Sequence, residues 1–88
     1  MEFEYNPDKS KSNKEKHGID FEKVKAIWLS NHVIVPAITR GEKRFMIIGM
    51  IGQDAYSCIF TLRKKRIRII SCRRARDKEG GIYHEKTR

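Results

Sequence analysis

The chain has 88 residues, of which 20 are Lys or Arg and 11 are Asp or Glu, so its formal net charge is +9. This length fits one domain over residues 1–88 and leaves no room for a second core. The main apolar run, residues 45–51, is far shorter than the roughly 20 residues of a transmembrane helix, and the acidic N-terminus does not resemble a signal peptide. We therefore expect a cytoplasmic protein without membrane attachment, whose positive charge attracts polyanions.

The N-terminal region predicts a short strand followed by a helix. Residues 2–5 alternate between acidic and aromatic side chains, which is the period of a strand. Asn6 is a good N-cap and Pro7 suits the first helical turn, so a helix is predicted over residues 7–17, ending at Gly18. The helix has almost no apolar side chain, so we expect little packing energy from it.

A second helix begins at Asp20, a plausible N-cap, with Ile19 before it placed to pack on Val24. It should end at residues 30–31. Its apolar residues recur at helical spacing and predict a face that packs on a sheet. These residues are Phe21, Val24, Ile27 and Trp28.

The remainder reads mainly as strands, over residues 32–38, 44–51, 56–63 and 66–72. Short connections imply antiparallel neighbours and therefore a meander. Gly80 and Gly81 predict that any helix in residues 73–85 is broken or ends early. The fold class is α+β, with N-terminal helices packed on a mainly antiparallel sheet and a short C-terminal helical segment.

Cys58 and Cys72 lie in apolar runs and predict small buried thiols in a reducing compartment. A metal site would need a histidine to join them, and no recognised ligand spacing is present. We expect neither a metal ion nor another cofactor.

Basic residues concentrate near the C-terminus. Arg66 and Arg68 alternate with Ile67 and Ile69, so the two arginines share one face of their strand. If the helix that carries Trp28 covers the apolar face, the other face becomes a cationic groove. The competing interpretation is a solvent-facing strand whose charge prevents edge pairing. Residues 63–76 include no acidic residue and eight basic residues, which are Arg63, Lys64, Lys65, Arg66, Arg68, Arg73, Arg74 and Arg76.

RNA can be cleaved without metal when the ribose 2′-hydroxyl attacks the adjacent phosphate. The reaction needs a base, an acid and cations for the developing charge. Candidates for proton transfer are His17, Tyr83 and His84, and candidates for phosphate binding are Arg44, Arg63, Arg73 and Arg74. The sequence alone does not bring them together.

Several motifs along the chain carry a resemblance. They include Lys16-His17-Gly18, Phe60-Thr61-Leu62-Arg63, the strand that continues into Arg73-Arg74, and Tyr83-His84-Glu85. In these motifs the chain resembles the BrnT family of type II toxins. The resemblance implies a RelE-like fold, a ribonuclease activity that arrests translation, and neutralisation by a DNA-binding antitoxin of the BrnA type. The toxin–antitoxin complex would then bind operator DNA through the antitoxin.

Together, the chemistry and the resemblance give two sets of site residues. The catalytic candidates are Arg63, Tyr83, His17, Arg74 and Arg73, and the RNA-binding candidates are Arg44, Lys64, Lys65, Arg66 and Arg68. The leading prediction is a metal-independent endoribonuclease. The alternative is a non-catalytic basic RNA-binding module, or an inactive toxin that acts as a co-repressor with its antitoxin. Growth arrest on expression of the chain alone would favour the enzyme.

Overall fold

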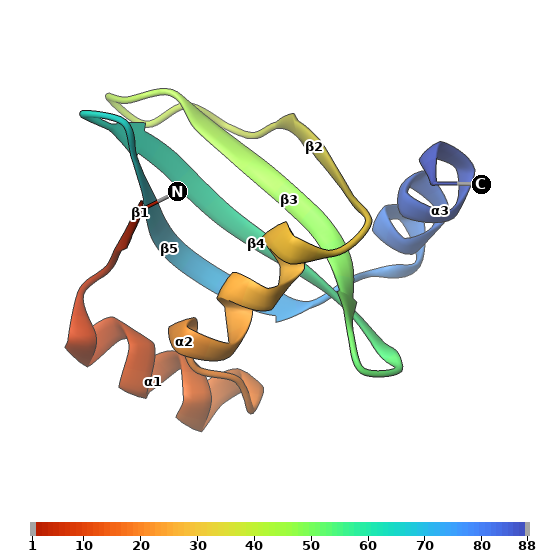
Figure 1. Cartoon of the computed structure of the whole chain (residues 1–88), viewed down its shortest axis with the longest axis horizontal. Coiled ribbons are helices and arrows are strands. Elements are labelled where there is room, and N and C mark those ends of the chain that lie inside the picture. Colours follow the sequence, from red (N-terminus) through yellow and green to blue (C-terminus); the bar gives the residue numbers. More distant parts are fainter. Residues whose placement is uncertain (1, 88) are drawn as a thin grey trace.

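A computed structural model describes residues 2–87 of the chain (Figure 1). It has α+β architecture, as predicted, with helices before and after the main sheet strands. In chain order the elements are β1 (Glu2–Glu4), α1 (Pro7–His17), α2 (Phe21–Val24), the 3-10 helix η1 (Lys25–Leu29), β2 (His32–Pro36), β3 (Arg44–Ile51), β4 (Asp54–Arg63), β5 (Arg66–Arg74) and α3 (Asp77–Lys86).

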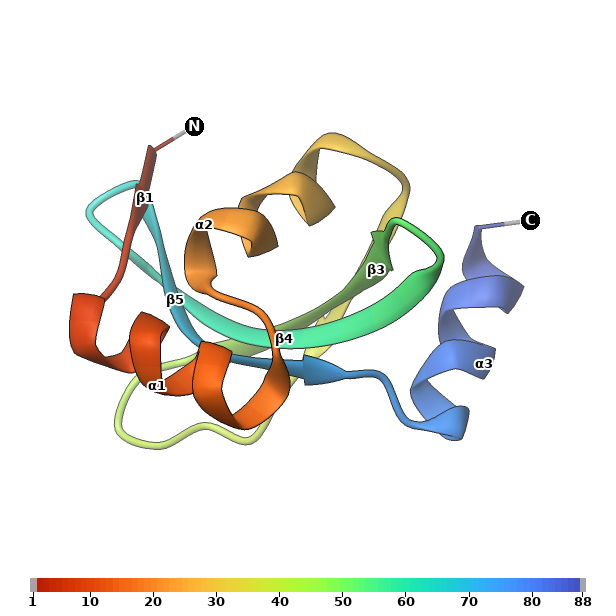
Figure 2. The same cartoon turned by 90° about the horizontal axis from the view of Figure 1, so that it is seen from below.

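The five strands form one sheet in the order β1-β5-β4-β3-β2. Strands β2 to β5 are consecutive antiparallel neighbours, which confirms the predicted meander. Strand β1 adds to the outer edge of β5 in the parallel direction. Figure 2 shows α2 lying over one side of this sheet, while α3 stands at one end of it.

Helix α1 has the predicted bounds, and polar side chains hold it in place. Asn6 caps its first turn and Gly18 closes it with a positive φ of 78°. The buried Ser10 hydroxyl accepts a hydrogen bond from the Phe21 amide at 2.8 Å. The buried Asn13 side chain donates to the Ile19 carbonyl and accepts from the Cys72 amide of β5, at 2.8 and 3.1 Å. These buried hydrogen bonds compensate for the apolar packing that the helix lacks, because leaving any of these buried polar groups without a partner would cost stability.

The second helical segment begins and ends where the sequence predicted, but its winding changes from α to 3-10 at Lys25. A single α-helical turn, α2, passes directly into η1. Phe21, Val24 and Ile27 are spaced by three residues and share one side of this segment, and the 3-10 winding of η1 keeps Ile27 in line with Val24. All three side chains are therefore buried against the sheet, as the sequence predicted.

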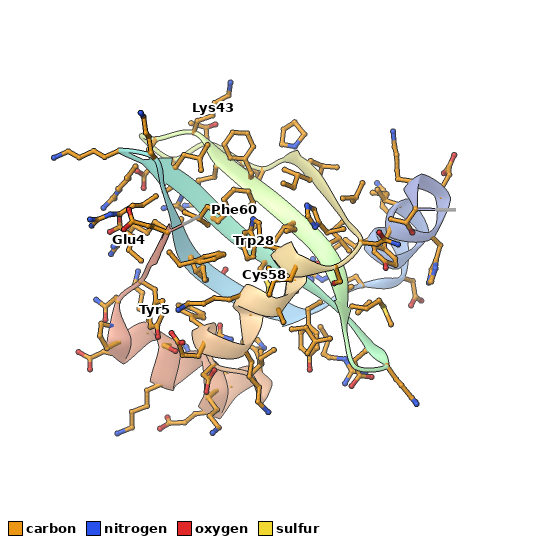
Figure 3. The ribbon with its side chains drawn as sticks, viewed as in Figure 1. Glu4, Tyr5, Trp28, Lys43, Cys58 and Phe60 are labelled. Atoms are coloured by element: carbon orange, nitrogen blue, oxygen red, sulfur yellow. A yellow bond between two sulfur atoms is a disulfide. The ribbon has the colours of Figure 1, made fainter. Side chains whose placement is uncertain are left out.

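Trp28 packs between two aromatic rings of the same core. Its ring lies edge-on to Phe3 of β1 and to Phe60 of β4, with both centroid distances 5.2 Å. Figure 3 shows Trp28 beside Phe60 above the sheet. Trp28 is only partly buried, so it closes the margin of the core.

The cysteines differ from the prediction of free thiols. Cys58 and Cys72 lie directly opposite each other on β4 and β5, and a disulfide joins them. The antiparallel register causes this meeting, because it brings residues distant in sequence to a Cα separation of 4.0 Å.

Helix α3 continues through Gly80 and Gly81, so the predicted break is wrong. Glu79 anchors its first turn, and Tyr83 is buried on the side of the helix that packs. These tertiary interactions offset the intrinsic cost of two helical glycines, about 1 kcal/mol each. No helix within residues 2–87 is long and apolar enough to cross a membrane.

Candidate functional site

The side of the sheet opposite α2 and η1 collects arginines from three strands. The register places Arg44 beside Thr61, and Thr61 beside Arg68, so all three side chains stand on this side. Arg63 of β4 pairs with Arg66 of β5, two residues nearer the β4–β5 turn and on the same side. We call this side the arginine face and define it by Arg44, Arg63, Arg66, Arg68 and Arg73. Arg63, Arg66 and Arg68 therefore share one side of the sheet, as the sequence predicted.

Four of these arginines have a carboxylate partner outside their own strand, and the tightest pair is Arg73 with Glu79 of α3. The other pairs are Arg63 with Glu42, Arg66 with Glu2, and Arg68 with Glu4. Two N–H groups of Arg73 donate to the two Glu79 oxygens at 2.7 and 2.8 Å. The face is therefore pre-ordered by ion pairs, and an incoming phosphate has to compete with carboxylates.

The environment of Glu79 lowers its pKa to about 2. The hydrogen bonds from Arg73 are the main cause, partial burial opposes them, and the Arg76 amide and the Ser57 hydroxyl add further donors. Glu79 is thus ionised at neutral pH, and it fastens the start of α3 to β4 and β5.

Arg44 differs from its neighbours on the arginine face. Within residues 2–87 it forms no ion pair, and its Nε atom is buried without a hydrogen-bond acceptor. Guanidinium groups bind phosphate oxygens through paired donors. Arg44 is consequently the arginine of this face whose guanidinium has no protein carboxylate as a partner among residues 2–87.

Lys64 and Lys65 form the turn between β4 and β5, where both have positive φ values of 48° and 68°. They are exposed at the end of the arginine face. Lys64 lines an open hollow there together with Arg63, Arg66, Glu2 and Glu4. These two predicted RNA-binding lysines therefore extend the cationic surface.

The remaining predicted residues lie elsewhere. Arg74 points to the opposite side of β5, where it pairs with Asp54 at 2.9 Å and lies over the Tyr56 ring. Tyr83 is 8% exposed in α3, with its ring against that of the exposed His84. His17 ends α1 and shares a shallow hollow with Ser71 of β5. Because Ser71 pairs with Ile59 on the arginine-face side, His17 lies at the border of that face.

A comparison with protein families decides what kind of protein carries this face. Residues 5–79 match the model of the family described as ribonuclease toxin, BrnT, of type II toxin-antitoxin system. The chain belongs to the BrnT family. No curated protein and no solved structure matches the chain. The match runs from the residue after β1 to Glu79, so it includes every residue of the arginine face of this BrnT chain.

Sequence reasoning missed the carboxylates that order the BrnT arginine face. Glu4 reaches Arg68 only because β1 pairs in parallel with β5, and Glu79 reaches Arg73 only because α3 folds back. The alternation of Glu2 and Glu4 around Phe3 was a usable signal, since it puts both acids on one face. Glu79 also accepts from the Arg76 amide, a local contact within its own helical turn, but its contact with Ser57 of β4 has no local signal.

Proposed function

We propose that this chain is a toxin that cleaves RNA on its arginine face, without a metal ion, and thereby inhibits translation in the cytoplasm. The observation that carries the proposal is the gathering of Arg44, Arg63, Arg66, Arg68 and Arg73 on one side of the sheet, in a chain that belongs to a ribonuclease toxin family. Fixed guanidinium groups stabilise the charge that develops on a phosphorane.

In the proposed reaction, the ribose 2′-hydroxyl loses its proton and attacks the adjacent phosphorus. The bond to the 5′-oxygen breaks, that oxygen takes up a proton, and a 2′,3′-cyclic phosphate is left. Arg44 holds the oxygens of the phosphate that reacts, and Arg73, in a row about 13 Å further along the strands, holds a neighbouring phosphate. Arg63 with the Lys64-Lys65 turn binds the flanking backbone. Proton transfer falls to His17, because its position at the border of the face leaves it exposed to substrate. Tyr83 is the second candidate for proton transfer.

The test incubates the chain, purified in EDTA, with unstructured RNA and identifies the new ends. The proposal predicts fragments with 2′,3′-cyclic phosphate and 5′-hydroxyl ends. His17→Gln should slow cleavage by about a hundredfold, within the range for a lost general acid or base. Tyr83→Phe deletes only a hydroxyl and tests the second candidate in the same assay. Intact RNA after incubation with the folded chain would contradict the proposal.

A second function is favoured by the ion pairs on the arginine face. Four of its arginines are already engaged by carboxylates, and this arrangement suits a chain that binds RNA weakly without cutting it, or an inactive toxin that serves as a co-repressor. Expression of the chain alone separates the two functions. The ribonuclease arrests growth, whereas the binding module does not.

We further propose a BrnA-like antitoxin as the protein partner, with the heterocomplex bound to operator DNA through the antitoxin. The family supports a partner of this class. Gel-shift measurements with the operator should show binding by the complex and only salt-sensitive, non-specific binding by the toxin alone.

A further inference from the structure

A second hollow opens on the arginine face, beside the loop that joins β2 to β3. Its volume is about 370 Å³. Its floor comes from the sheet, through the part-buried side chains of Met46 and Ile59. Ile38, 78% exposed, stands at its loop side. The hollow is completed by Pro36, Ala37, Arg40 and Arg44.

The apolar floor lies between two cationic rows of the sheet. Arg44 and Arg68 form one row across β3, β4 and β5, and Arg73 lies in another row that begins at Ile48 of β3. The two rows are four residues apart, which is about 13 Å along a strand. A strand of RNA whose phosphates bind the arginines would therefore place a base over Met46 and Ile59. Bases stack on guanidinium planes, and nucleobase pockets also hold a base between apolar side chains.

The polar side chains of the hollow supply donors only. Arg40 and Arg44 are its two polar side chains, and within residues 2–87 neither is in an ion pair. A bidentate arginine fits two adjacent acceptors, which guanine presents at O6 and N7. Adenine presents the N6 amino group, a donor, beside N7, so an arginine N–H would face an N–H of the base. The donor set therefore selects guanine over adenine.

We propose that this hollow is a nucleobase subsite that binds guanine, with Arg40 reading the base edge and Ile38 covering the ring. Arg44, in the same row as Arg68, holds the adjoining phosphate. This inference rests on the proposed function in one respect, because it takes RNA to be the ligand of the arginine face. It goes further by assigning the base and the residues that choose it.

The test measures binding and not cleavage. The probes are 2′-O-methyl oligouridylates, which cannot be cut, carrying one central guanine, adenine or 7-deazaguanine, with affinity measured by fluorescence anisotropy. The intact chain should bind the guanine probe roughly 5- to 150-fold more tightly than the adenine probe, the range of a bidentate arginine–guanine contact. The 7-deazaguanine probe, which lacks N7, should bind like adenine.

Two variants and a control assign the effect. Arg40→Met should abolish the preference for guanine, while Ile38→Gln should weaken the guanine and adenine probes by similar factors. Lys23→Met removes one positive charge from the exposed side of α2 and should keep the preference. Both Arg40 and Ile38 are exposed, so neither variant endangers folding.

Equal affinity of the intact chain for guanine and adenine probes would overturn the proposal. So would a preference that survives in Arg40→Met. If the variants weakened binding of the antitoxin and left the base preference unchanged, the hollow would be a protein-docking surface and the proposal would also fail. Cleavage of unmodified RNA is scored separately: a chain that prefers guanine but cuts no RNA would refute the proposed function and retain this subsite.

Discussion

Removing the negative charge of Glu79 should destabilise the protein and do so only above acidic pH. The side chain is 14% exposed and accepts four hydrogen bonds, from Ser57, Arg76 and two N–H groups of Arg73. Folding lowers its pKa from an ordinary 4.5 to about 2, and this corresponds to about 3 kcal/mol of stability. Glu79→Gln retains one acceptor oxygen, so we expect a loss of about 2–3 kcal/mol at pH 7.

The sign of the pH dependence follows from the direction of the pKa change. A carboxyl whose pKa is lowered by folding stabilises the protein above its unfolded pKa and loses that effect as protons bind. The difference in free energy of unfolding between the intact chain and Glu79→Gln should therefore be constant above pH 5. It should shrink as the pH falls from about 4.5 toward 2.

Urea unfolding followed by circular dichroism measures this difference, and thermal unfolding should show a midpoint about 10–20 °C lower at pH 7. Glu85→Gln is the matched control, because it removes the same charge from an exposed position of the same helix. We expect it to change stability by less than about 0.5 kcal/mol. Equal stability of the two variants at pH 7 would refute the role assigned to Glu79.

Two further predictions concern the core and the cationic surface. Trp28→Ala should lower the free energy of unfolding by about 3 kcal/mol, the lower end for a large aromatic, because the ring is partly exposed. Leu29→Ala, at a 90% exposed position, should change unfolding in urea very little. Similar losses of stability in the two variants would contradict the packing of Trp28. Changing Lys64, Lys65 and Arg66 together to Gln should flatten the slope of log RNA affinity against log salt by about two to three. Binding releases about one counterion fewer for each phosphate contact that is lost. An unaltered slope would move the RNA path away from this turn.

The parts of the fold that sequence predicted correctly are those with local causes. Asn6 and Gly18 set the ends of α1 through their own conformations and hydrogen bonds, and β3 has the bounds that its apolar run implies. The continuation of α3 through Gly80 could not be predicted in this way. Its anchor, Glu79, depends on Arg73 and also on Ser57 of β4, and a contact with a strand that distant in sequence leaves no local pattern.

The candidate site was predictable to the same extent. Alternation along β5 placed Arg66 and Arg68 together, because the period of a strand is two. The same rule places Arg73 and Arg74 on opposite faces of β5, although the Arg73-Arg74 motif predicted a shared site. The motif alone does not indicate on which side of the sheet each of its side chains lies.

The most direct test of the central claim compares two arginines of equal charge on opposite sides of the sheet. Single-turnover cleavage of an RNA oligonucleotide is measured in EDTA for Arg44→Gln and Arg74→Gln, at concentrations that saturate binding. Arg44→Gln should reduce the rate by about a hundredfold or more, as loss of a fixed donor to a developing charge does, whereas Arg74→Gln, on the other face with Asp54, should stay within a few-fold of the intact chain. Equal effects of the two substitutions, or a larger effect of Arg74→Gln, would contradict the assignment of catalysis to the arginine face.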